Sequence, residues 1–302
     1  MIVGLDRAVY FAPRGKRRLM ILGNIIAQRY LNPDDRLIGL IGEGGAGKSL
    51  LIRGMFPGLN LTNDDDGVNV RPLPLLTDYE DDHFRTHTYH LDAHFELAFV
   101  QPWRLVDAVR RAVEHGKRVV VEHFELLHPL IGMHAEILVG IGEDVVVVRP
   151  SIFGPDPHEL AREVFASIGY RRMAHSAEDL TSIVLEGMGL ARPEIHSDVK
   201  RGFLLEFQEK PQVDLAEVEA GVRSFIERDA RIAYYDDEHI QIEDLVYPCS
   251  GPRIHVGHAG EIKGFHLLPE FRLSPLTRRY LLAGLVGTSG EPDHEVLDPG
   301  EG

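Results

Sequence analysis

Short apolar runs alternate with segments of helical periodicity along the first 170 residues. The run at residues 36–41, RLIGLI, ends at a glycine, and a continuous apolar run of this length is typical of a buried parallel strand. The same pattern predicts strands at residues 36–41, 59–61, 86–91, 117–121 and 144–148, and helices at residues 15–30, 50–55, 103–114, 158–168 and 173–190. Strands that alternate with helices imply a doubly wound, mostly parallel α/β sheet with helices on both faces.

Composition limits the class of protein. The chain has 302 residues, of which 44% are hydrophobic and 26% charged, as in ordinary globular proteins. The longest clearly apolar run, residues 145–148, is far shorter than the roughly 20 residues that span a bilayer, so we expect no membrane partner. The single cysteine, Cys249, excludes an internal disulfide, and we expect a cytoplasmic protein.

The strongest motif is GEGGAGKS at residues 42–49, which fits the phosphate-binding pattern G-x-x-x-x-G-K-[ST]. Its glycines would turn backbone N–H groups toward phosphate oxygens, Lys48 would reach the β and γ phosphates, and the Ser49 hydroxyl would hold Mg²⁺. The motif lies between a predicted strand and a predicted helix and therefore predicts an α/β P-loop NTPase that binds ATP and Mg²⁺. The predicted nucleotide contacts are Gly42, Glu43, Gly44, Gly45, Ala46, Gly47, Lys48, Ser49 and Leu50.

Phosphoryl transfer also needs acidic residues near the metal and the acceptor. Glu122 follows the strand at residues 117–121 and could support the metal, or it could be a solvated strand-end carboxylate or a helix cap. Asp64, Asp65 and Asp66 follow the possible strand at 59–61 and could contact an acceptor hydroxyl, or they could form a polar turn. Other candidates are Asp92 as a strand-end acid and, as phosphate clamps or ion-pair partners, Arg53 and Arg149. The predicted catalytic residues are Lys48, Glu122, Asp64 and Asp65.

A second group of chemically active side chains lies in the latter half of the chain. His175 and Asp179 are four residues apart on a predicted helix and therefore share one face. Cys249 and His255 follow about 70 residues later, and His, Asp, Cys and His form a sensible four-ligand set for Zn²⁺.

The segment from about residue 170 to 285 resembles the second additional domain of alanyl- and threonyl-tRNA synthetases and of their free-standing editing relatives. The resemblance rests on HSAED at residues 175–179 and on CSGPRIHVGHAGEIKGF at residues 249–265. The chain departs from the family at Asp179, where the family has histidine, and by two extra residues between Cys249 and His255. The resemblance implies an α+β domain, a zinc site and hydrolysis of mischarged aminoacyl-tRNA. In its combination of parts, the whole chain is similar to uridine-kinase-like proteins.

These observations predict a P-loop nucleotide-binding domain at residues 1–169, an editing-like domain at 170–287 and a flexible tail at 288–302. Three functions remain open: a kinase-like phosphotransferase acting on a nucleoside or amino-acid-related molecule, an ATPase switch, and a metal-dependent editing hydrolase. The formal net charge of −15, with the greater acidic excess after Tyr170, disfavours tRNA as a partner. The guanine-reading motif N-K-x-D is absent from the sequence, which favours ATP over GTP.

Overall fold

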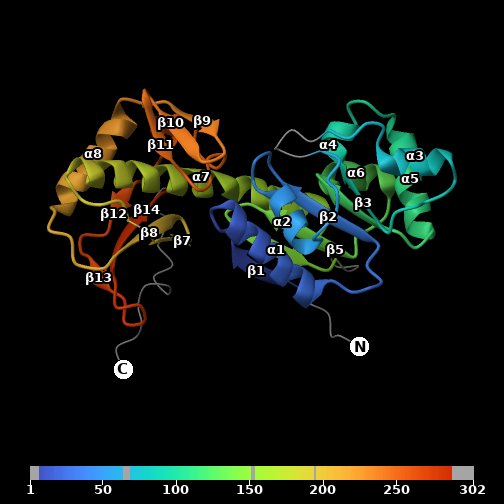
Figure 1. The fold of residues 1–302 in the computed structure, drawn as a ribbon, viewed down its shortest axis with the longest axis horizontal. Coiled ribbons are helices and arrows are strands. Elements are labelled where there is room, and N and C mark those ends of the chain that lie inside the picture. The colour runs from blue at the N-terminus through green and yellow to red at the C-terminus, as the bar shows by residue number, and fades with distance from the viewer. Residues whose placement is uncertain (1–6, 64–68, 151–153, 194, 288–302) are drawn as a thin grey trace. The chain divides into compact units, whose positions relative to one another are not determined.

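The chain divides into two compact units, Met1–Gly169 and Tyr170–Gly302 (Figure 1). The computed structural model describes residues 7–63, 69–150, 154–193 and 195–287. The predicted tail at 288–302 therefore lies outside the described residues. Over the described part of the chain, no helix is both long and apolar enough to cross a membrane.

The first unit is built on a six-stranded sheet with the order β1-β6-β5-β2-β4-β3. Its strands are β1 (Arg7–Phe11), β2 (Leu37–Gly42), β3 (Thr88–Asp92), β4 (Arg118–Glu122), β5 (Ile137–Ile141) and β6 (Asp144–Val148). The neighbours β5, β2, β4 and β3 run parallel, whereas β6 is antiparallel to both β5 and β1. The carboxyl ends of β2, β4 and β3 consequently meet at one edge of the sheet.

The predicted fold class, a doubly wound and mostly parallel P-loop NTPase sheet followed by a synthetase-like α+β domain, is wrong. The first unit has a mixed sheet, in which two of the five strand pairings are antiparallel. The turn at residues 142–143 joins β5 directly to β6, and so short a turn can connect only antiparallel strands, since a parallel connection needs a dozen residues or more. The strands β1 and β5 were not predicted from the sequence, and β6 was predicted to be one more parallel strand.

Helices cover both faces of this sheet. They are α1 (Lys16–Tyr30), α2 (Lys48–Met55), α3 (Pro74–Glu80), α4 (Ala93–Glu96), α5 (Pro102–Glu114), α6 (Phe124–Ile131) and the first part of α7 (Pro157–Gly187). Alternate residues of β2 face opposite cores: Leu37 and Ile41 pack with α3, α5 and α6, whereas Ile38 and Leu40 pack with α1 and α2. Burial of both faces explains why β2, β5 and β6 are almost entirely apolar.

Helix α2, which begins with the lysine and serine of the phosphate-binding motif, packs closely on α1. Gly23 of α1 faces the backbone of Leu51, and Gly54 of α2 faces the backbone of Met20. A side chain at either glycine would collide with main-chain atoms that cannot move aside, so both positions require glycine. This contact holds the start of α2 in place at the end of β2.

The second unit contains two antiparallel sheets and the latter part of α7. One sheet has the order β11-β10-β9, and the other has the order β12-β14-β8-β7 with β13 paired to β14. The strands are β7 (Ile195–Val199), β8 (Gly202–Phe207), β9 (Ile232–Asp236), β10 (His239–Ile242), β11 (Leu245–Pro248), β12 (His266–Leu267), β13 (Arg272–Leu273) and β14 (Tyr280–Leu285). Helix α8 (Leu215–Glu227) and the 3-10 turn η1 (Ala259–Glu261) complete the unit. Its core gathers Ala177 and Leu180 of α7 with Phe203 of β8 and Val218 of α8.

Most of the other expected elements are confirmed within a few residues, with two exceptions. Residues 59–61 form no strand, and the nearby pairing is the isolated bridge between Asn63 and Asn69. The helices expected at 158–168 and 173–190 are one continuous helix, because α7 runs through Gly169 without interruption. Glycine is tolerated inside a helix at a cost of about 1 kcal/mol, which the packing of a long helix can offset.

Candidate phosphate-binding site and metal cluster

Residues 43–47 connect the end of β2 to the start of α2, which is the strand–loop–helix arrangement that the motif predicts. Gly45 and Gly47 have φ angles of 76° and 103°, in the left-handed region that favours glycine. Gly47 is also the residue that precedes the first turn of α2, where backbone N–H groups lack helical partners. The side of Gly44 where a side chain would stand is open to at least 4 Å. A loop of this backbone form at the start of a helix can present backbone donors to an anion.

Lys48 is buried beneath the start of this loop. Its ammonium group donates hydrogen bonds to the carbonyl oxygens of Gly42 at 3.1 Å and Glu43 at 3.0 Å. The Nζ atom also lies 3.8 Å from Oε2 of Glu122, and both side chains are about 5% exposed. A positive charge thus lies at the carboxyl edge of the sheet, held between two carbonyls and one carboxylate.

Glu122, the last residue of β4, lies between the ends of two neighbouring strands. Its register partners are Leu40 on β2 and Asp92 on β3. The hydroxyl of Ser49, on the first turn of α2, donates to Oε1 of Glu122 at 2.9 Å. The alternative that Glu122 is a solvated strand end does not apply, since its residue exposure is 3%.

His90 of β3 extends the same network. The backbone N–H of Thr62 donates to Nδ1 of His90 at 3.1 Å, so Nε2 carries the ring hydrogen and donates it to Oε1 of Glu122 at 3.2 Å. Burial by itself would raise the pKa of the Glu122 carboxyl. The hydrogen bond from His90, the charge of Lys48 and the hydrogen bond from Ser49 outweigh burial and hold that pKa below its usual value.

These side chains fit a magnesium–phosphate ligand chemically. The Ser49 hydroxyl and the ionised Glu122 carboxylate are hard oxygen donors 2.9 Å apart, which is the donor type that Mg²⁺ prefers. The Lys48 ammonium and the N-terminus of α2 are the positive groups that a phosphate requires. The donors therefore suit a hard divalent cation beside an anion.

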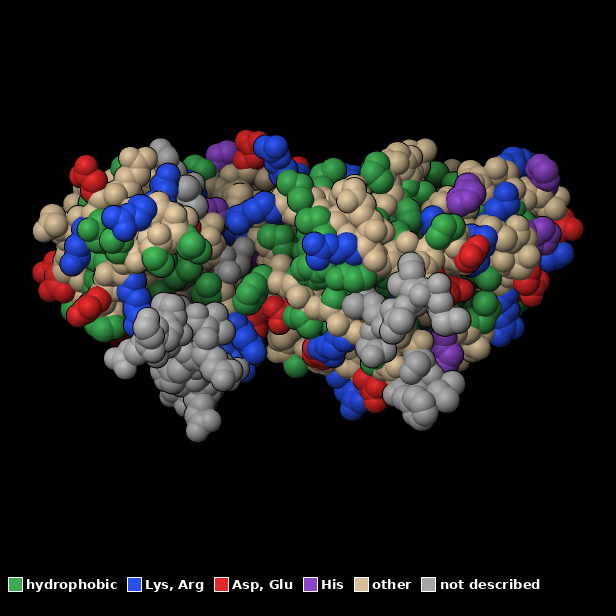
Figure 2. All heavy atoms as spheres, turned by 90° about the horizontal axis from the view of Figure 1, so that it is seen from below, with side chains coloured by type: hydrophobic (Ala, Val, Ile, Leu, Met, Phe, Trp, Pro, Cys, Tyr) green, Lys and Arg blue, Asp and Glu red, His purple; other side chains and the backbone are tan. Residues whose placement is uncertain are grey.

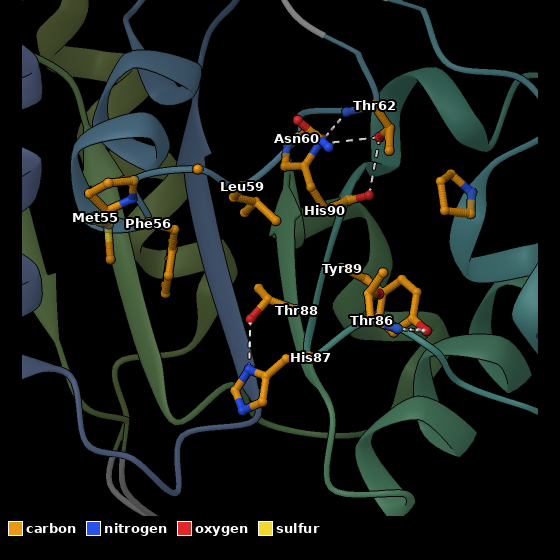
Figure 3. A pocket seen from close by; sticks show the side chains of 13 residues that line it. Met55, Phe56, Leu59, Asn60, Thr62, Thr86, His87, Thr88, Tyr89 and His90 are labelled. Carbon is orange, nitrogen blue, oxygen red and sulfur yellow. Dashed lines mark hydrogen bonds between the residues drawn. The ribbon is translucent and has the colours of Figure 1, made fainter.

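A cavity of about 560 Å³ lies beside the edge strand β3, within the usual size range of small-molecule sites (Figure 3). Residues 55–60 form one wall and residues 86–90 form the other. Thr62 and His90 line this cavity and also belong to the hydrogen-bonded network of Glu122. A second cavity of about 710 Å³ shares the segment 56–62 and is lined in addition by Arg53.

The other candidate residues from the sequence lie outside the described residues, lie at another edge of the sheet or have a local structural role. Asp64, Asp65 and Asp66 lie outside the described residues. Asp92 caps α4 by accepting the backbone N–H of Phe95 at 3.0 Å. Arg149 pairs with Asp35 at 2.7 Å, where β6 ends beside the start of β5, so this arginine lies at the opposite edge of the sheet from the phosphate-binding loop.

In the second unit the structure brings three of the four predicted zinc ligands together. One ligand atom each of Asp179, Cys249 and His255 lies within 4.8 Å of the other two. Nε2 of His255 is 2.9 Å from Oδ2 of Asp179 and 3.9 Å from Sγ of Cys249. His175, one turn earlier on α7, is buried and lies outside this group.

The neighbours of His255 raise the pKa of its imidazole. Burial alone would lower the pKa of His255, but the hydrogen bond and charge of Asp179, together with Cys249, raise it to about 9. Carboxylate oxygen, thiolate sulfur and imidazole nitrogen are all zinc ligands, and three protein ligands with an open fourth position are typical of catalytic zinc. The donors present therefore fit Zn²⁺.

Comparisons with known proteins do not identify a family. No family model matches the chain, and no curated protein matches it. Among solved structures, the ornithine aminotransferase of Toxoplasma gondii ME49 is similar with 9% identity and a TM-score of 0.24, over 83% of this chain and 69% of that one. An aminotransferase of Eubacterium rectale is similar with 10% identity and a TM-score of 0.25, over 84% of this chain and 68% of that one. Neither is a P-loop NTPase or a tRNA-synthetase domain, and likeness at these TM-scores carries no functional argument.

His90 and Thr62 are the members of the first site that sequence reasoning missed. His90 belongs to a strand in which Tyr89 and Leu91 are buried, and it is itself 2% exposed. A histidine in a strand next to a candidate metal-supporting strand is a weak signal, because only the register pairs it with a particular partner. Thr62 contributes a backbone N–H, which carries no sequence signal at all.

Proposed function

We propose that the first unit is an ATP-dependent phosphotransferase that acts on a small molecule bound in the cavity beside β3. The observation that carries this proposal is the continuous network of Lys48, Ser49, Glu122 and His90, which joins the glycine loop to that cavity. A charged loop without an adjoining cavity would suit a nucleotide switch equally well. The cavity, which shares His90 with the network, favours a second substrate.

Each side chain has a role that its position supports. Backbone N–H groups of residues 44, 45, 47 and 48 would bind phosphate oxygens, whereas the N–H of Ala46 donates to the carbonyl oxygen of Glu43 at 3.2 Å. Lys48 would neutralise the charge that develops between the β and γ phosphates. Ser49 and Glu122 would hold the Mg²⁺ ion that accompanies ATP. His90, fixed by Thr62, holds the Glu122 carboxylate in position and in its ionised form.

The acceptor proposed for the cavity is a nucleoside or an amino-acid-related molecule. Phe56, Leu59 and Tyr89 supply apolar lining, while Asn60 and Thr88 supply polar groups (Figure 3). Such a lining suits a small molecule with one flat or apolar side and several hydroxyl or amino groups.

The decisive experiment measures ATP turnover by the full chain with Mg²⁺, alone and with separate pools of nucleosides, amino acids and tRNA. The proposal predicts that one small-molecule pool stimulates turnover and yields a phosphorylated product by mass spectrometry. Equal turnover with every pool would contradict the phosphotransferase and favour an ATPase switch. Stimulation by tRNA alone would also contradict it.

A matched pair of variants tests the loop itself. Lys48→Ala removes a charge-assisted interaction worth about 1.5–3 kcal/mol, so ATP affinity should fall by about 10- to 100-fold. Lys117→Ala removes a lysine that precedes β4 at the opposite edge of the sheet and should leave ATP affinity unchanged. Equal affinities for the two variants, measured by calorimetry, would contradict the assignment of the loop.

A second candidate function, hydrolysis of mischarged aminoacyl-tRNA by the second unit, is supported by the convergence of Asp179, Cys249 and His255. Bound zinc would supply Lewis-acid chemistry for cleavage of the ester. The face in Figure 2 carries basic side chains interspersed with acidic and apolar ones, and no continuous basic surface is visible there among the described residues. Purified protein should contain zinc that Cys249→Ser releases and the neighbouring Ser250→Ala retains. A zinc-free preparation, or no deacylation of mischarged tRNA, would exclude this candidate.

A further inference from the structure

A cluster of imidazole and carboxylate groups joins α6 to the beginning of α7 within the first unit. One ligand atom each of His128, Asp156 and His158 lies within 4.8 Å of the other two. The Nδ1 atom of His128 is 3.8 Å from Oδ2 of Asp156. The ring of a fourth residue, His134, lies 5.2 Å from that of His128. Neither the phosphate-binding network nor the cysteine cluster uses these residues.

The carboxylate of Asp156 is held in one orientation by the helix that it caps. Its Oδ1 accepts the backbone N–H of His158 at 2.8 Å, while its own N–H donates to Oε2 of Glu159 at 3.1 Å. These reciprocal bonds, together with Pro157 as the first residue of α7, are typical of the capped N-terminus of a helix. Because Oδ1 is occupied by the cap, Oδ2 is the oxygen that faces His128.

We propose that His128, Asp156 and His158 form a zinc-binding site that joins the end of α6 to the start of α7. Two imidazole nitrogens and one carboxylate oxygen form a donor set typical of Zn²⁺, and ligand bonds of about 2.0–2.2 Å would require the three atoms, which lie within 4.8 Å of one another, to move closer together around the ion. The ring of His134 lies beside that of His128, and a water molecule would complete the tetrahedral set.

The charges around the cluster permit a cation. The N-terminus of α7 carries a partial positive charge that alone would repel a metal ion, and the Asp156 carboxylate lies between them and offsets it. His128 is only 15% exposed in its side chain, whereas that of Asp156 is 43% exposed, so an ion would enter from the solvent side. Residues 128 and 156 lie on either side of the β5–β6 hairpin, and bound zinc would cross-link the chain there.

The test measures Zn²⁺ binding by tag-free full-length protein, because a polyhistidine tag would bind the same ion. The starting protein carries Cys249→Ser, so that the thiolate of the second unit cannot contribute. Asp156→Asn is the principal variant, since asparagine is an equally good helix cap but lacks the charge of the ligand. His158→Gln removes an exposed ligand, and His83→Gln changes an exposed histidine outside the cluster.

Equilibrium dialysis should show that Asp156→Asn and His158→Gln each lower the affinity for Zn²⁺ at least about 10-fold, because each variant loses a proposed ligand. The affinity of His83→Gln should be unchanged. Zinc should also protect His128 and His158, but not His83, from modification by diethylpyrocarbonate. Equal zinc affinities in all three variants, or equal modification with and without zinc, would overturn the proposal. Both readouts are independent of ATP turnover, so the result stands apart from the function proposed above.

Discussion

Replacing Glu122 by glutamine tests whether the network at the carboxyl edge of the sheet is electrostatic. Glutamine has nearly the same shape, and its carbonyl oxygen can still accept hydrogen bonds from Ser49 and His90. What it removes is the negative charge 3.8 Å from Nζ of Lys48. The substitution therefore isolates the charge from the packing.

The expected loss of stability is the difference between the attraction of Glu122 to Lys48 and the cost of burying the carboxylate. At an effective dielectric constant of about 20, two unit charges 3.8 Å apart attract by about 4 kcal/mol. Burying the carboxylate costs several kcal/mol, which glutamine avoids. Because the pKa of Glu122 is lowered in spite of burial, the favourable terms exceed the cost, and Lys48 retains two carbonyl partners in the variant. We expect Glu122→Gln to lower the free energy of unfolding by about 1–3 kcal/mol at pH 7.

The pH dependence distinguishes charge from shape. A carboxyl whose pKa is lower in the folded than in the unfolded chain stabilises the fold above the unfolded value of 4.5. That stabilisation is lost as pH falls through the folded value. The stability difference between the wild-type protein and Glu122→Gln should therefore be constant near neutrality and should shrink below about pH 4.5.

Urea unfolding followed by the fluorescence of Trp103, the single tryptophan and part of α5 in the first unit, measures this difference. Glu125→Gln is the matched control, since Glu125 is also buried but pairs with His123 instead of Lys48. An unchanged urea midpoint for Glu122→Gln at pH 7 would refute the electrostatic account. A stability difference that persists unchanged to pH 3.5 would refute it as well.

Three further substitutions have definite expected outcomes. Gly47→Ala forces a φ of 103° on alanine and drives its side chain into α1, so the melting temperature should fall by several degrees and ATP affinity should drop, as calorimetry will measure. Arg149→Leu leaves the buried Asp35 carboxylate without its arginine and should cost about 3 kcal/mol in urea unfolding, with ATP affinity unchanged. In chelator-treated protein, Asp179→Asn should reduce stability most below pH 6.5, where His255 is charged in both states, and the difference should vanish as pH rises through about 9.

The sequence predicted the succession of β2, the glycine loop and α2 better than the strand directions of the sheet. The apolar run of β2, the glycines and the start of α2 are adjacent in the chain, so one motif describes all three. The direction of β6 depends on the two-residue turn after β5, and it was missed because residues 137–141 were not recognised as a strand. Strand β1 is half exposed, with alternating intermediate and exposed residues, and lacks the continuous apolar pattern of its neighbours.

Some residues of the candidate sites could be predicted from the sequence, whereas others are brought together only by the pairing of the strands. Lys48 and Ser49 follow from the motif, and Glu122 follows from its position at a strand end. The link from Glu122 to His90 depends on the register of β3 against β4, which periodicity does not specify. The cluster of His128, Asp156 and His158 is assembled by the β5–β6 hairpin that separates its members along the chain, so their spacing in sequence carries no metal signature.

The bonds of Lys48 have a consequence for how an anion enters the loop. The ammonium group already has three oxygen partners, and one of them, the Glu122 carboxylate, is itself an anion. Glu122, at the end of β4, thus competes with an incoming phosphate for the Lys48 ammonium group, and the phosphate must displace it. A divalent cation that draws the carboxylate toward itself removes that competitor, so cation and phosphate should promote each other's binding by the same factor. Free phosphate compounds without a metal ion should consequently be poor ligands for this loop.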